Sequence, residues 1–160
     1  MKSGTALALA LVALFGFGGL LGSLPAFAEE SLLMARSCQG FPETMLALQE
    51  SIKAHDYRVA RVQRVDIGLT QAGFVTDKYR IVFYGNTEEV RMLTRNYPEL
   101  IPFLPLNFSI FAEGEQTLVV AMNPSYLGHH YQAPELQILF ARWESDVRSI
   151  LADVRKAAQE

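Results

Sequence analysis

The sequence predicts an α+β protein, a two-layer sandwich in which helices cover a mainly antiparallel sheet. The first observation is the stretch from Tyr79 to Pro124, in which strand-like runs of β-branched and aromatic residues alternate with turn residues. The second is the stretch after Pro134, whose apolar residues recur every three or four positions, as on one face of a helix. The third is the length of 160 residues, which suits a single domain.

The first 28 residues are expected to be a signal peptide that does not belong to the fold. Lys2 precedes an uninterrupted apolar run from Ala6 to Leu14, and Ala26 and Ala28 stand at alternate positions before two glutamates, as at a cleavage site. The alternative is an uncleaved membrane anchor, because Thr5 to Leu24 approaches the roughly 20 residues that cross a bilayer. Since four glycines interrupt that stretch, we favour cleavage near Ala28, which predicts a periplasmic or secreted protein with no stable membrane anchor.

The mature chain is expected to begin with a strand and a helix. Ser31 to Ser37 alternates weakly and is a plausible first strand, and the helix begins after Gly40, with one apolar face made of Phe41, Met45, Leu48 and Ile52. Arg58 to Asp66 has strand composition, but its valines change phase, which predicts a bulge or a lightly buried edge. Ile67 to Lys78 contains two glycines among polar residues and is expected to be a loop.

Arg80 to Tyr84 is expected to be a strand that turns into a helix at Asn86. Asn86 can cap this helix, and Glu89 stands three residues later, at the capping-box position. The free amides of such a turn could also hold an anion, but Gly85 is its only glycine and no lysine accompanies it, so capping is the favoured interpretation.

The remaining elements are a hairpin and a long helix. Residues 107–112 and 117–122 are expected to pair about Gly114. The helix that begins at Pro134 carries an apolar stripe: Leu136, Phe140, Trp143, Val147, Ile150, Val154 and Ala157. Because neighbouring leucines widen this stripe, packing on the sheet of the same chain is favoured, and a dimer contact is the second alternative.

The composition argues against two classes of partner. A net charge of −3 disfavours nucleic acid, whose recognition requires a basic face, and a polybasic membrane surface. Cys38 is the single cysteine, so no intramolecular disulfide can form. We expect its thiol to be buried among apolar neighbours, with an intermolecular bond as the alternative.

The residue pattern predicts no catalytic residue, metal site or cofactor. Ser109 and Ser125 lack the context of an activated nucleophile, and Cys38 has no histidine nearby in the sequence. Cys38, Met122 and His130 are soft or imidazole ligands that suit a transition metal, but their spacing matches no ligand motif. A periplasmic metal or redox accessory protein that uses these three residues is therefore the second functional hypothesis.

Several short motifs, in order, resemble the DUF302 family of uncharacterised bacterial and archaeal proteins. Tyr84-Gly85-Asn86 is similar to the turn that opens the family's central helix. Leu104-Pro105-Leu106 is similar to the segment that leads into the family's next strand, and Asn123-Pro124 is similar to the segment that follows its last strand. Thr87 stands where the family usually has proline. Some branches carry cysteines where this chain has Gly85 and Leu106, so their thiol chemistry does not transfer. The resemblance implies a compact two-layer domain, often a homodimer, with no established reaction.

The resemblance covers roughly Ala35 to Tyr131, which leaves the last helix outside it. We therefore expect a signal peptide (1–28), a DUF302-like domain (29–132) and a C-terminal helix packed on that domain (133–160). The expected function is that of an exported, non-enzymatic binding or accessory protein whose partners are a second copy, a small molecule or a periplasmic protein. A ligand site is expected near the ends of the central strands, at Tyr84, Asn86, Asn107, Met122 and His130.

Overall fold

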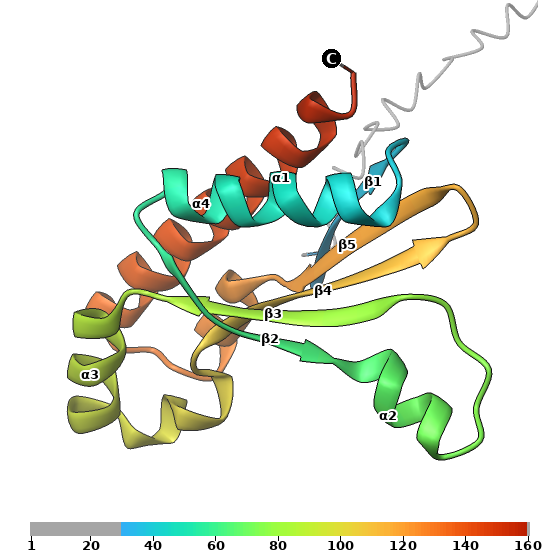
Figure 1. Cartoon of the computed structure of the whole chain (residues 1–160). Coiled ribbons are helices and arrows are strands. Elements are labelled where there is room, and N and C mark those ends of the chain that lie inside the picture. Colours follow the sequence, from blue (N-terminus) through green and yellow to red (C-terminus); the bar gives the residue numbers. More distant parts are fainter. Residues whose placement is uncertain (1–29, 160) are drawn as a thin grey trace, which may run out of the picture.

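The computed structural model describes residues 30–159, which form one five-stranded antiparallel sheet and four α-helices (Figure 1). The expected signal peptide lies outside the described residues. The strands are β1 (Leu32–Ser37), β2 (Arg58–Arg64), β3 (Tyr79–Gly85), β4 (Leu106–Glu113) and β5 (Gln116–Met122). The α-helices are α1 (Phe41–Ala54), α2 (Val65–Gln71), α3 (Thr87–Asn96) and α4 (Pro134–Ala157), and two 3₁₀ helices are η1 (Pro98–Phe103) and η2 (Pro124–His129).

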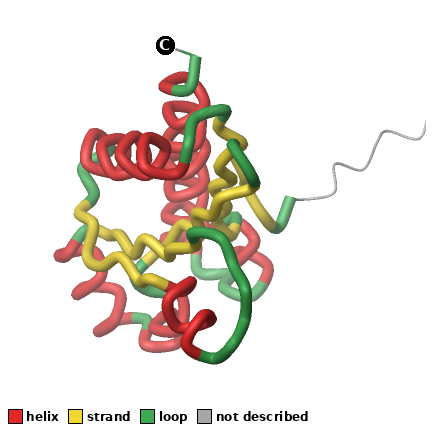
Figure 2. Tube along the Cα trace, turned by 45° about the vertical axis from the view of Figure 1, so that its right-hand side comes forward, coloured by secondary structure: helices red, strands yellow, loops and turns green. Residues whose placement is uncertain are grey.

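Helices α1 and α4 pack together on one side of the sheet (Figure 1 and Figure 2). The strand order is β1-β5-β4-β3-β2, so α1 connects the two edge strands across the sheet. Alternate side chains of each strand point toward these helices, as the two-residue period of a strand requires. The largest fully buried side chains come from both layers: Trp143, Tyr84, Phe108, Phe140, Leu33, Leu48, Ile52, Leu93, Leu100, Ile110, Ile150 and Val82. The predicted α+β class is confirmed.

Buried and exposed residues alternate more strictly along β1 than its sequence suggested. Leu33, Ala35 and Ser37 are buried, whereas the residues between them are exposed. Cys38 follows in the outward phase and is exposed, so the expectation of a buried thiol is wrong. The alternation that begins at Leu33 explains this exposure.

Strand β2 is an edge strand with a register shift between Val59 and Arg61, which confirms the predicted irregular edge. The prediction of a loop from Ile67 to Lys78 is wrong in its first half, because residues 65–71 form helix α2. This helix has no buried residue and therefore lacks the apolar period that identifies most helices. Asp66 in its first turn forms an ion pair with Arg80 of β3, which ties α2 to the sheet.

The hairpin and the last helix are confirmed. Strands β4 and β5 pair from Ser109–Val120 to Glu113–Gln116, and Gly114 in the turn has a φ of 62°, which suits glycine. In α4 the buried residues are Leu136, Phe140, Trp143, Val147, Ile150, Leu151 and Val154. The apolar stripe of α4 therefore packs against other elements of the same chain, which was the favoured alternative.

Asn86 caps helix α3 as predicted. Its Oδ1 accepts hydrogen bonds from the backbone N–H of Glu88 at 3.0 Å and of Glu89 at 3.2 Å. The Glu89 carboxylate makes its side-chain hydrogen bonds to α4, with Arg142 and Trp143, so the structure has no reciprocal capping box here.

Replacing Asn86 with alanine is expected to lower the free energy of unfolding by about 1 kcal/mol, because two backbone donors lose their acceptor. Asn86 is exposed, so no core packing changes with it. Urea denaturation of the purified protein measures the loss. Asn96→Ala, at the other end of the same helix, is the control and should not destabilise. Equal losses in the two variants would contradict the capping role.

Candidate functional site

A small cavity of about 140 Å³ lies where β3, β4 and β5 meet η1, η2 and α4. Its walls are mostly apolar, and Tyr84 and Asn107 bring the polar groups to it. The lining residues are Tyr84, Pro102, Phe103, Leu106, Asn107, Ala121, Met122, Pro124 and Val147. Apolar walls with a few polar groups are typical of small-molecule sites, although most such sites are larger.

Tyr84 is the buried polar residue of this cavity, with a side chain that is only 1% exposed. Its ring stacks on Phe108 with centroids 5.0 Å apart and meets the Tyr57 ring edge-on at 5.4 Å. Burial raises the pKa of the Tyr84 phenol far above its ordinary value, so the hydroxyl keeps its proton at any physiological pH.

The Tyr84 hydroxyl has no hydrogen-bond partner among residues 30–159. Within the same range, every fully enclosed side-chain polar atom does have a partner. The Tyr84 oxygen therefore keeps a small accessible surface, and Tyr84 is one of the residues that line the cavity. A buried hydroxyl without a protein partner is normally satisfied by ordered water, which a ligand with an acceptor atom can replace.

A polar network behind Tyr84 holds the surrounding elements together. The Tyr57 hydroxyl donates to Asp146 at 2.5 Å, and Arg142 donates to the Tyr57 hydroxyl at 3.1 Å. Arg142 also pairs with Glu89, whose other carboxylate oxygen accepts from the Trp143 indole N–H at 2.8 Å. Burial, followed by the hydrogen bond to Asp146, raises the pKa of Tyr57. The network joins the connection before β2 to α3 and α4, around the Tyr57 ring that packs on Tyr84.

The structure gathers three of the five predicted site residues. Tyr84, Asn107 and Met122 line the cavity. Asn86 lines a different hollow, and His130 is exposed at the end of η2, where its ring lies 6.4 Å from that of Tyr126.

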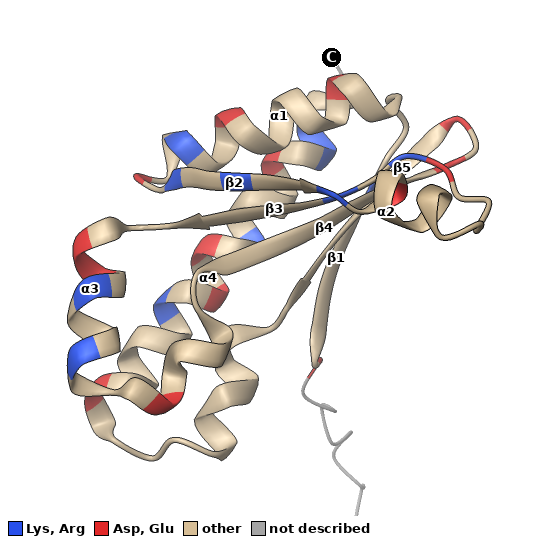
Figure 3. Cartoon of the chain, turned by 60° about the horizontal axis from the view of Figure 1, so that its bottom comes forward, with Lys and Arg blue, Asp and Glu red and all other residues tan. Residues whose placement is uncertain are grey.

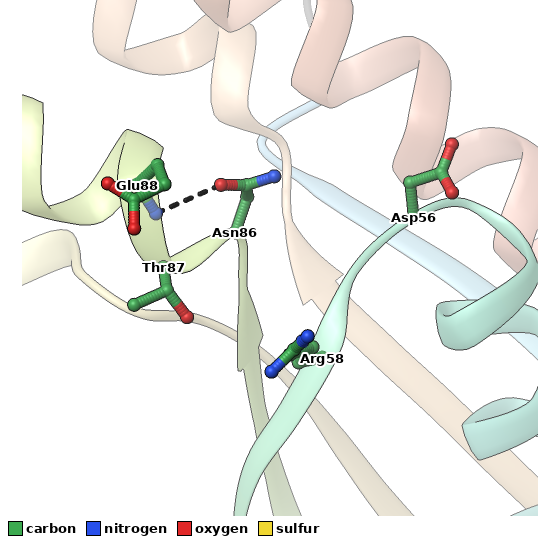
Figure 4. A pocket seen from close by; sticks show the side chains of 5 residues that line it. All are labelled: Asp56, Arg58, Asn86, Thr87 and Glu88. Carbon is green, nitrogen blue, oxygen red and sulfur yellow. Dashed lines mark hydrogen bonds between the residues drawn. The ribbon is translucent and has the colours of Figure 1, made fainter.

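The hollow at Asn86 has a volume of about 300 Å³ and is lined by Asp56, Arg58, Asn86, Thr87 and Glu88 (Figure 4). It lies at the beginning of α3, where free amides could bind an anion. Asn86 already occupies two of those amides, and two carboxylates share the lining. These contacts agree with capping as the favoured role of the turn.

The residues of the metal hypothesis are not brought together. Ser37 pairs with Thr117, whereas Leu32 pairs with Met122, so Cys38 and Met122 belong to opposite ends of the β1–β5 ladder. Five residues of strand separate these ends by roughly 17 Å, far beyond a shared metal ion. Residues 30–159 contain no group of three or more His, Cys, Asp and Glu side chains that could hold a metal ion.

Sequence reasoning missed six of the nine wall residues, among them Leu106 of β4 and Ala121 of β5. Pro102 and Phe103 belong to η1, Pro124 begins η2, and Val147 belongs to α4. Val147 was identified only as part of an apolar stripe, and such a stripe does not reveal which of its members borders a cavity. Within the described part of the chain, no helix is both long enough and apolar enough to cross a membrane.

The family model of DUF302, a domain of unknown function, matches residues 34–156 and so includes most of α4. The chain is also similar to a crystal structure of an uncharacterised conserved DUF302 protein from Bacillus stearothermophilus, with 21% identity and a TM-score of 0.70. That similarity covers 78% of this chain and 98% of the other and shows the shared fold. No curated protein matches the chain. Because the family model spans most of the sequence, the chain belongs to the DUF302 family.

Proposed function

We propose that this DUF302 protein is an exported, non-enzymatic binding protein whose small-molecule ligand occupies the cavity at Tyr84. The observation that carries the proposal is that Tyr84, whose buried hydroxyl has no hydrogen-bond partner among residues 30–159, lines the cavity. Binding is favoured over catalysis because Tyr84 is the only titratable group in the lining. A phenol with a raised pKa is a poor general base near neutral pH.

Export rests on the sequence of residues 1–28, with cleavage near Ala28. Mass spectrometry of the protein recovered from an expressing bacterium tests it. We expect a mature chain that begins near Glu29 in the periplasmic or secreted fraction. Recovery of the full-length chain in the membrane fraction would overturn the proposal of export in favour of an uncleaved anchor.

The binding role is tested with the mature protein and a broad panel of small molecules in a thermal-shift assay. A ligand that raises the melting temperature should bind Tyr84→Phe about three- to tenfold more weakly, which corresponds to one net hydrogen bond. Tyr79→Phe removes a hydroxyl from the same strand outside the cavity and should bind like the wild type. No shift with any compound would contradict the small-molecule role and leave a protein partner.

We also propose that the protein forms a homodimer through the sheet face opposite α1 and α4. The three central strands carry only Arg80 and Glu113 as charged residues, both near strand ends, and Figure 3 shows most of their length without charge. Leu32 and Met34 of β1 are nearly half exposed on this face. Arg36, which pairs with Glu113, and Arg61 of β2 lie toward the edges of this face, so its uncharged part is the centre. An uncharged centre suits an identical face better than a charged partner, and two-fold pairing places the same patch on both sides.

Light scattering of the mature protein tests the dimer. We expect a dimer at micromolar concentration that Met34→Lys converts to a monomer, because the lysine would be buried without a partner. The control is Leu46→Lys, which introduces the same charge at an exposed position of α1 and should remain dimeric. A wild-type monomer at all concentrations would refute this assembly.

A further inference from the structure

The absence of charged side chains from the cavity at Tyr84 restricts which ligands it can bind. Its lining contains no lysine, arginine, histidine, aspartate or glutamate. An ion placed there would lose its hydration without gaining a counter-charge, which opposes its binding. The walls therefore select against carboxylates, phosphates and ammonium groups.

The polar groups of the cavity restrict the ligand further. The protonated Tyr84 hydroxyl offers a hydrogen bond from a buried position, whereas Asn107 is exposed and offers its amide at the rim. A ligand that fills the apolar space without an oxygen or nitrogen acceptor would leave the Tyr84 hydroxyl unsatisfied, which weakens its binding. The site should therefore bind an otherwise apolar molecule more tightly when that molecule carries one acceptor atom.

The size of the cavity completes the description. A volume of about 140 Å³ is close to that of a cavity that holds one benzene molecule. Phe103 and Met122 offer an aromatic and a thioether wall, both of which suit a ring.

We propose that the cavity takes a neutral six-membered ring that carries a single hydroxyl or carbonyl oxygen, and that this oxygen accepts a hydrogen bond from Tyr84. This inference rests on the proposed binding function and names the chemical class of the ligand. Any larger substituent would leave past Asn107 at the rim.

The experiment titrates five probes into ¹⁵N-labelled mature protein: phenol, cyclohexanone, toluene, benzoate and benzylammonium. We expect phenol and cyclohexanone to shift the amide signals of cavity residues and to bind at least tenfold more tightly than benzoate or benzylammonium. Toluene should bind about three- to tenfold more weakly than phenol, because it leaves the Tyr84 hydroxyl unpaired. Tyr84→Phe should abolish the preference for phenol over toluene, whereas Tyr79→Phe should keep it.

Three results would overturn the assignment. Benzoate or benzylammonium binding as tightly as phenol would refute a neutral ligand. An unchanged phenol preference in Tyr84→Phe would refute the role of the hydroxyl. If no probe binds, the ligand class is wrong, and the broad thermal-shift panel then decides separately whether the binding function also fails.

Discussion

Trp143→Ala is expected to lower the free energy of unfolding by about 3–5 kcal/mol, the largest effect among the substitutions considered. Trp143 lies in the middle of α4, is 2% exposed and packs against Phe140 with ring centroids 5.8 Å apart. Its truncation removes a large buried apolar surface and leaves a void in a closely packed core. Urea denaturation of the purified protein, followed by circular dichroism, measures the loss.

The matched control for this substitution is Ile138→Ala on the same helix. Ile138 is 73% exposed, so its truncation should change the free energy of unfolding by no more than about 0.5 kcal/mol. Comparable losses for Trp143→Ala and Ile138→Ala would contradict the orientation of α4, because the two residues would then be equally buried.

Glu89→Leu is expected to destabilise the protein by about 1–3 kcal/mol. Among residues 30–159, the substitution removes the only acceptor of the buried Trp143 indole N–H and one of the two carboxylates that pair with Arg142. Asp146 and Tyr57 still bond to Arg142, which keeps the loss below that of a core truncation. Because the chain has a single tryptophan, its fluorescence reports both the unfolding midpoint and the changed surroundings of the indole.

Two further variants separate the causes of this loss. Glu89→Gln keeps an oxygen acceptor for the indole but not the charge for Arg142, and should destabilise less than Glu89→Leu. Glu88→Leu removes the same charge from the first turn of α3, although within the described part of the chain Glu88 pairs only with the exposed Arg91. If Glu88→Leu cost as much as Glu89→Leu, the helix dipole and not the bonds to α4 would explain the loss.

Most of the fold follows from local patterns in the sequence. The stripe of α4, the hairpin about Gly114 and the cap at Asn86 depend on residues close together in the chain, and all three were predicted. Helix α2 was not, because it buries no side chain and so has no apolar period. The exposure of Cys38 was also missed, although the phase of β1 predicts it once Leu33 is known to point inward.

The candidate site was predicted only in part. Tyr84, Asn107 and Met122 come from adjacent strand ends, which the hairpin and the preceding strand already place together. His130 was included because of its chemistry, and no pattern in the sequence specified where η2 would direct it. The network of Tyr57, Glu89, Arg142 and Asp146 depends on contacts between distant segments, which single-sequence periodicity does not record.

The position of β1 has a consequence for when the chain can fold. Leu32 pairs with Met122, and β5 is the only strand that pairs with β1 within the described sheet. Helix α4, which covers β1, is made later still. During synthesis the first strand must therefore wait for the last strand and the last helix, and such distant pairings slow folding. In the proposed exported protein, this delay would keep the emerging chain extended and able to pass through a narrow translocation channel before its native contacts exist.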